Sequence, residues 1–290
     1  MPACRTRAVP SGTCDAAHEG IGDQNRGGGI TPSELGALSC TLVNINLLFL
    51  VIAGFTAGFY GSSVGSGGLV SLPALLLVGL PTPVAIATNR FAIVFGEGMS
   101  VLQYRRTQKI PWGFAVAIGV LAAAGSLIGS RLVLGLSAHT LNVLVAIILV
   151  SVLLVLLFKP QLGSEERELL RHHKIFLGIG AFFLGIYGGF IGTGFGTFIM
   201  LLLASGGFSL LRSSAIARVV GFFASLVAAL SFASANVILY PEGISLAAGY
   251  VVGCFFGVRV GVKRGNNYIR ILLIIVILLS AGQLLWKALR

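Results

Sequence analysis

Long apolar runs, separated by short polar loops, make up most of the chain after Val43. The run Leu141–Phe158 (LNVLVAIILVSVLLVLLF) holds no charged residue over 18 positions, about the length of a helix that crosses the bilayer core. Comparable runs fall near 43–62, 69–80, 84–104, 112–136 and 139–158, and again near 175–191, 197–206, 213–235, 244–262 and 268–287. The alternating ten-residue segments of a membrane β-barrel are absent. The pattern therefore predicts an all-α integral membrane protein.

The two sets of segments share motifs in the same order. The pattern G-x-Y-G-x-x-x-G-x-G occurs twice at an offset of 127, AIA recurs at an offset of 130, and GSLIGSR matches GCFFGVR at an offset of 128. The matched motifs begin at Gly58 and Gly185, at Ala85 and Ala215, and at Gly125 and Gly253. Three ordered matches predict a duplicated unit of about five segments.

The basic residues of the loops indicate that the second unit is inverted. Loop 105–109 has three basic residues and its counterpart 236–243 has none, whereas loop 137–140 has no Lys or Arg and its counterpart 263–267 has two. The positive-inside rule gives opposite bias in matched loops when repeats are inverted. The three basic stretches, the third being 159–174, are then cytoplasmic and both termini lie outside.

The first residues differ from the membrane part. The stretch 21–36 is polar and glycine-rich, which predicts disorder, and it lacks the apolar core of a cleavable signal peptide. A start codon assigned too far upstream explains it equally well. The predicted organisation is a disordered extension over 1–42, a repeat over 43–158, a cytoplasmic connector over 159–174 and a repeat over 175–290.

Neither the net charge nor the cysteines indicate a nucleic-acid-binding surface or a metal site. The chain is 56% hydrophobic and 10% charged with a net charge of +11, but its Lys and Arg lie between the apolar runs and so mark topology, not nucleic-acid binding. The cysteines at 4, 14, 40 and 254 show no C-x-x-C spacing and form no metal pattern with the four histidines. We predict no metal and no cofactor.

Glycine clusters interrupt the apolar runs at the same place in both sets. Backbone groups freed by a helix break must face protein or a watery cavity, and the first amides of the next helix attract an anion. We predict substrate-binding residues at Gly65, Ser66, Gly67, Gly68, Gly192, Thr193 and Gly194. For the outer glycines 61, 65, 188 and 192, close packing between helices is the alternative.

Ionisable residues stand inside two of the apolar segments. Thr88, Asn89 and Arg90 follow the first AIA stretch, Arg218 follows the second, and Glu97 is the one acid within a predicted hydrophobic segment. Such groups are costly at membrane depth and often functional. We assign the first four to substrate binding, each arginine beside the break of its own half, and Glu97 to coupling with H⁺ or Na⁺. Snorkelling arginines, or an Arg90–Glu97 pair two turns apart, are the alternatives.

These features resemble the sulfite exporter TauE/SafE family, also called the toluene sulfonate uptake permease family. The likeness covers about Ile45 to Leu285 and is most specific over Gly61–Asn89, GSSVGSGGLVSLPALLLVGLPTPVAIATN. Phe195, between the glycines of the second break, and Arg218, in place of an expected threonine, depart from the family pattern. The resemblance implies transport of sulfite, organic sulfonates such as sulfoacetate, or related anions across a bacterial cytoplasmic membrane.

We therefore expect a secondary transporter, not an enzyme, with a small anionic substrate and the lipid bilayer as its partners, and we leave a homodimer open. Two alternatives remain. A passive anion channel would look the same in sequence. An intramembrane hydrolase would have to use Ser66 and His139, and His139 lies at a segment end.

Overall fold

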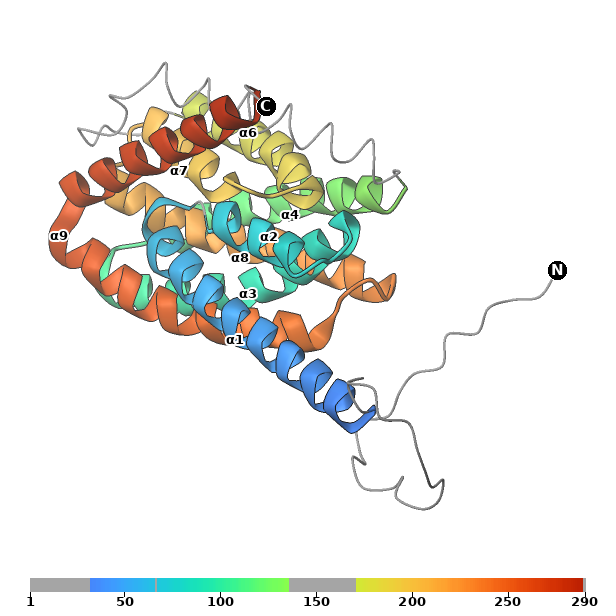
Figure 1. The fold of residues 1–290 in the computed structure, drawn as a ribbon. Coiled ribbons are helices and arrows are strands. Elements are labelled where there is room, and N and C mark those ends of the chain that lie inside the picture. Colours follow the sequence, from blue (N-terminus) through green and yellow to red (C-terminus); the bar gives the residue numbers. More distant parts are fainter. Residues whose placement is uncertain (1–31, 66, 136–170, 289–290) are drawn as a thin grey trace, which may run out of the picture. The chain divides into compact units, whose positions relative to one another are not determined.

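The computed structural model describes residues 32–65, 67–135 and 171–288, and these residues form helices and no strand, which confirms the all-α prediction. The predicted segment 139–158, most of the connector 159–174 and Ser66 lie outside the described residues. The helices are α1 (Pro32–Val64), α2 (Gly68–Leu77), α3 (Thr82–Thr107), α4 (Trp112–Gly135), α6 (Arg171–Phe190), α7 (Phe195–Ser205), α8 (Leu210–Ser234) and α9 (Tyr240–Ala288) (Figure 1).

The chain divides into two units, Met1–Cys40 and Thr41–Arg290, and the second holds most of α1 and all of the later helices. Helix α1 begins at Pro32, so the predicted disordered extension over 1–42 is helical in its last part. Helix α6 likewise begins at Arg171, inside the predicted connector.

Within the part of the chain that the structure describes, four helices are long and apolar enough to cross a membrane: Ile45–Val64, Trp112–Gly135, Leu210–Ser234 and Tyr240–Ile269. They expose many large apolar side chains, such as Leu48 (62% exposed) and Leu230 (61% exposed), which suits contact with lipid tails. Within α9, Gly265 has φ +70° and ψ −162°, so a kink separates the two runs expected on either side of 263–267.

Helices α2 and α7 are too short to cross. They have 10 and 11 residues, which at 1.5 Å per residue is about 15–17 Å, roughly half of the hydrocarbon core. Each follows a glycine break, so each reaches from the break toward one side only.

The repeated GSLIGSR and GCFFGVR motifs make matching helix contacts. Gly125 and Gly129 of α4 lie against backbone carbonyls of α6, and Gly253 and Gly257 of α9 lie against backbone carbonyls of α1. Figure 1 shows α1 beside the first part of α9. A Cβ at any of these glycines would overlap a carbonyl oxygen, so the small residue permits the close approach that stabilises helix pairs in lipid.

Helices α3 and α8 pack against each other, and α3 also contacts α9 while α8 contacts α4 and α7. At one end of α3, the Tyr104 hydroxyl donates to the Ser62 carbonyl (3.2 Å). At the other end, the Leu239 amide donates to the Thr88 hydroxyl (3.1 Å). The middle of α3, between these two anchors, faces the two glycine breaks.

Candidate functional site

Both predicted breaks are present, and positive φ angles make them. After α1 ends at Val64, Gly65 turns the chain with φ +89°, and α2 starts three residues later. After α6 ends at Phe190, Gly192 (φ +70°) and Gly194 (φ +79°) turn the chain into α7. Residues with a Cβ rarely adopt such angles, which explains why glycine stands at these positions in both halves.

The two breaks touch each other. Gly65 lies against the backbone of Gly196 and Thr197, and the Thr197 hydroxyl donates to the Val64 carbonyl (2.7 Å). On the other side, a Cβ at Gly68 would stand 3.2 Å from the Cα of Thr193. Each turn therefore packs on the start of the short helix that follows the other turn.

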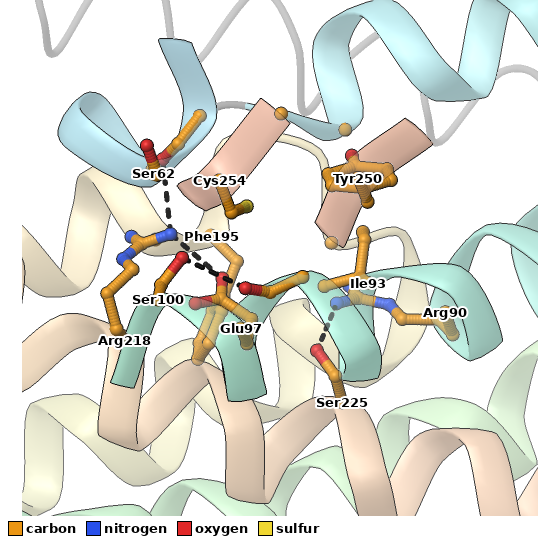
Figure 2. A pocket seen from close by; sticks show the side chains of 17 residues that line it. Ser62, Arg90, Ile93, Glu97, Ser100, Phe195, Arg218, Ser225, Tyr250 and Cys254 are labelled. Atoms are coloured by element: carbon orange, nitrogen blue, oxygen red, sulfur yellow. Dashed lines mark hydrogen bonds and ion pairs between the residues drawn. The ribbon is translucent and has the colours of Figure 1, made fainter. Parts of the chain in front are cut away.

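Arg218, from α8, reaches the first break. Its Nη1 donates to the Gly61 carbonyl (3.2 Å) and to Oε1 of Glu97 on α3 (2.8 Å), as Figure 2 shows. Its Nη2 lies against Gly65, where an added Cβ would be only 2.7 Å away. A glycine at this position therefore makes room for the guanidinium.

Arg90, from α3, reaches the second break. It donates to the Gly188 carbonyl, and its Nη1 lies 3.4 Å from the Ser225 hydroxyl of α8 (Figure 2). Its guanidinium fills the space that a Cβ at Gly192 would need. These contacts correct the expectation that each arginine stands beside the break of its own half, because Arg90 hydrogen-bonds with the second break and Arg218 with the first. Glu97 pairs with Arg218, and not with Arg90 as in the alternative interpretation.

A small cavity lies between the arginines. About 20 Å³ is open to the centre of a water molecule, slightly more than the roughly 10–15 Å³ that one water needs. Its lining includes Arg90, Glu97, Ser100, Arg218, Ser225 and Tyr250. The arginines are 2% and 3% exposed and the Glu97 side chain 12%, so two cations and one acid leave one uncompensated positive charge among the described lining residues.

Several polar atoms around the cavity have no hydrogen-bond partner in the described part of the protein: Arg90 Nε, Glu97 Oε2, Thr193 Oγ1, and Nε and Nη2 of Arg218. Buried polar groups in folded proteins are nearly always paired, with protein or with water.

The predicted glycines of the two breaks lie at or next to the cavity. Gly65, Gly67, Gly68 and Gly192 line the cavity, and Gly194 precedes the first turn of α7.

Thr88 and Asn89 make hydrogen bonds between helices. Thr88 accepts from Leu239, and Asn89 accepts from the Ser71 hydroxyl (2.7 Å), which also lies 2.8 Å from the Tyr250 hydroxyl. These bonds join α3 to α2 and α9, so both side chains have a structural partner.

The sequence analysis missed Ser225, Ser100, Tyr250 and Cys254, all of which line the cavity. One signal was available, because Ser225 follows Arg218 by seven residues just as Glu97 follows Arg90 by seven. The other three are uncharged residues within apolar runs, where nothing distinguishes them from core positions.

The model of the family described as "Sulfite exporter TauE/SafE" matches residues 50–284, which includes both breaks and the whole cavity. The chain belongs to the sulfite exporter TauE/SafE family. No solved structure shows significant similarity to it.

Curated relatives point to the same broad activity. A Sinorhizobium protein named "Probable membrane transporter protein ORF9" is 28% identical over 240 residues, covering 82% of this chain and 92% of that protein. A Haemophilus influenzae protein named "Probable membrane transporter protein" is 28% identical over 246 residues, covering 84% of this chain and 96% of that protein. An Arabidopsis thaliana protein named "Sulfite exporter TauE/SafE family protein 3" is 31% identical over 117 residues, covering 40% of this chain and 21% of that protein.

With several helices able to cross a bilayer, this TauE/SafE family member is a multi-pass membrane transporter of the bacterial cytoplasmic membrane.

Proposed function

We propose that this transporter moves a small anion, such as sulfite, sulfoacetate or another organic sulfonate, by secondary transport, and that it catalyses no covalent chemistry. The observation that carries the proposal is the charge of the cavity where the two breaks meet. Two buried arginines and one glutamate line that cavity. A buried charge without a counter-charge is costly, so the cavity favours a bound anion.

The arginines suit the oxygens of a sulfonate, sulfite or carboxylate group. A guanidinium presents its N–H groups as a planar fork, and it replaces lost hydration with charge-assisted hydrogen bonds. The proposed binding set is Arg90, Arg218, Gly65, Gly67, Gly68, Gly192, Thr193 and Gly194, with Ser66 beside them in sequence. Thr88 and Asn89, whose hydrogen bonds join α3 to neighbouring helices, would hold Arg90 of the same helix in position. The narrow cavity favours compact anions over bulky ones.

Glu97 is the group that we propose for coupling to a proton. Its Oε1 accepts from Arg218 while its Oε2 has no partner in the described part of the protein. Protonation would cancel the charge of this carboxylate and weaken its hold on Arg218. A proton and an anion would then bind in a mutually favourable way, which links their movements.

A purified-protein assay tests the substrate class. We would measure the melting temperature of the full chain in detergent with sulfite, sulfoacetate, taurine and simple carboxylates, because a ligand that binds the native state raises it. We expect a rise with sulfite or sulfoacetate and none with chloride at the same ionic strength. If no anion raises the melting temperature, the proposed substrate class is wrong.

Proteoliposomes distinguish a carrier from a channel. A carrier loaded with unlabelled anion should accumulate labelled sulfite transiently by counterflow and saturate as its concentration rises. With Glu97→Gln, we expect uptake that no longer responds to an imposed pH gradient. Linear, non-saturating flux would favour the passive channel.

A further inference from the structure

Each arginine at the cavity makes the same backbone contact. Arg218 donates to the Gly61 carbonyl near the end of α1, and Arg90 donates to the Gly188 carbonyl near the end of α6. The arginines are 128 residues apart in sequence and the two carbonyls 127, close to the offsets of the repeated motifs. The two halves thus build two equivalent cationic positions, one at each break.

The side chain opposite each arginine differs between the halves. Arg218 faces Glu97, seven residues after Arg90, and Arg90 faces Ser225, seven residues after Arg218. The first pair is a salt bridge of 2.8 Å between Nη1 and Oε1, whereas the second is a weak contact of 3.4 Å between Nη1 and a hydroxyl. One cationic position therefore has a carboxylate from the protein, and its equivalent has a short neutral side chain in the same place.

We propose that the anionic group of the substrate binds beside Arg90 and Ser225, in the place that corresponds to the Glu97 carboxylate beside Arg218. The inference rests on the proposed function and deepens it. The Glu97 carboxylate beside Arg218 shows how an anionic group with two oxygens binds next to one of these arginines. Arg218 is then neutralised by the protein, and Arg90 is the cation that the substrate neutralises.

Both positions have unpaired polar atoms, since Nε and Nη2 of Arg218 also lack a hydrogen-bond partner in the described part of the protein, but Arg218 is paired with a carboxylate and Arg90 only with a hydroxyl. Arg90 Nε and the Thr193 hydroxyl both lack a hydrogen-bond partner in the described part of the protein, and both residues are 2% exposed. Ser225 is 1% exposed and lines the cavity, so its hydroxyl is available to a bound group and hidden from lipid. The serine hydroxyl oxygen is two bonds nearer its Cβ than a glutamate carboxylate oxygen is, so Ser225 fills less of the space beside Arg90 than a glutamate would.

The assignment defines the class of substrate. Because only Arg90 needs a negative charge from the substrate, we expect one anion to bind per chain. A group with two or more oxygens on one atom, such as a sulfonate, sulfite or carboxylate, can use the guanidinium fork, whereas a halide cannot accept two parallel bonds in that geometry.

The test places a carboxylate of the protein beside Arg90, where we propose that the substrate binds. In the full chain purified in detergent, Ser225→Glu places a glutamate opposite Arg90, as Glu97 stands opposite Arg218. Isothermal titration with methanesulfonate, which keeps one charge at all accessible pH values, and with sulfite gives affinity and stoichiometry. Ser225→Gln adds the same bulk without charge, and Ser205→Glu adds the same charge at an exposed serine at the end of α7.

We expect wild type and Ser205→Glu to bind one anion per chain. Ser225→Glu should lose at least about 10-fold to 150-fold in affinity, the loss that removal of one charge-assisted contact produces, and Ser225→Gln should lose less. The exchange variant Glu97→Ser/Ser225→Glu should bind again within about 10-fold of wild type, because Arg218 then carries the open position. Equal binding by wild type and folded Ser225→Glu, or no recovery in the folded exchange variant, would overturn the inference.

A second variant covers the case in which Ser225→Glu does not fold. Glu97→Ser alone opens the position at Arg218 beside the one at Arg90, so we expect two anions per chain. A stoichiometry of one in folded Glu97→Ser, with unchanged affinity, contradicts the proposed equivalence. Failure of the proposed function gives a different result, because wild type itself would then bind neither anion.

Discussion

Arg218 on α8 and Glu97 on α3 form an ion pair of 2.8 Å, and their side chains are only 3% and 12% exposed. The pair joins the two halves of the sequence at the centre of the protein. Removing one partner of a buried pair leaves the other charge uncompensated, at a typical cost of about 3–5 kcal/mol.

Glu97→Leu should therefore lower the melting temperature of the detergent-purified protein strongly. Glu97→Gln should lower it less, because the amide oxygen still accepts from Arg218. Glu242→Leu is the matched control, since Glu242 stands in the first turn of α9, away from the cavity lining. Equal melting temperatures of Glu97→Leu and Glu242→Leu would mean that the ion pair contributes nothing to stability.

Substitutions of Arg90 should mainly change anion affinity, and substitutions of Arg218 should mainly change stability. Arg90→Gln should weaken anion binding by about 10- to 150-fold, and Arg90→Lys should weaken it moderately, because lysine keeps the charge and loses the fork. Arg218→Gln should weaken anion binding less than Arg90→Gln does and should act mainly on stability, because Glu97 already neutralises Arg218. Arg131→Gln, at an exposed position of α4, is the control and should change neither. Calorimetric affinities within about twofold for all variants would assign the buried arginines to structure alone.

The fold and the breaks could be predicted because their causes are local. Apolar runs of fixed length predict helices in a bilayer, and glycine clusters within them predict turns with positive φ. The buried residues Arg90, Glu97 and Arg218 stood out for the same reason, since a charge inside an apolar run is visible without a structure.

The pairing of these charges could not be predicted. A single sequence shows that Arg90 and Glu97 share one helix face, but it does not show that α8 packs on α3 so that Arg218 takes the glutamate. The same limit affects Gly54, which reads as an ordinary helix glycine. In the structure Gly54 lies against the Leu246 carbonyl of α9, so even an alanine there would overlap the neighbouring backbone.

The break glycines should tolerate no side chain where an arginine approaches. In Gly192→Ala, φ would have to stay near +70° and the Cβ would displace the Arg90 guanidinium, so we expect loss of transport and a lower melting temperature. Gly113→Ala, in the first turn of α4, is the matched control, because nothing lies within 4 Å of its Cβ position. Normal sulfite uptake by Gly192→Ala would separate the second break from the substrate path.

The last prediction concerns the inverted arrangement of the repeats. Gln108 ends α3, whereas Tyr240 begins α9 and packs on Phe91, about 26 Å back along α3 by the helical rise, so the two positions should lie on opposite sides of the membrane. Tyr240 is 50% exposed and suits labelling better than the neighbouring Gly243, which packs against the Phe91 ring.

In a chain with cysteines 4, 14 and 40 replaced by serine, an impermeant maleimide should label Gln108→Cys from the cytoplasmic side and Tyr240→Cys from outside. Cys254 can remain, because it is buried and donates to the Gly58 carbonyl (3.5 Å). Labelling of both cysteines from one side would contradict inverted repeats and, with them, the equivalence of the two arginine positions.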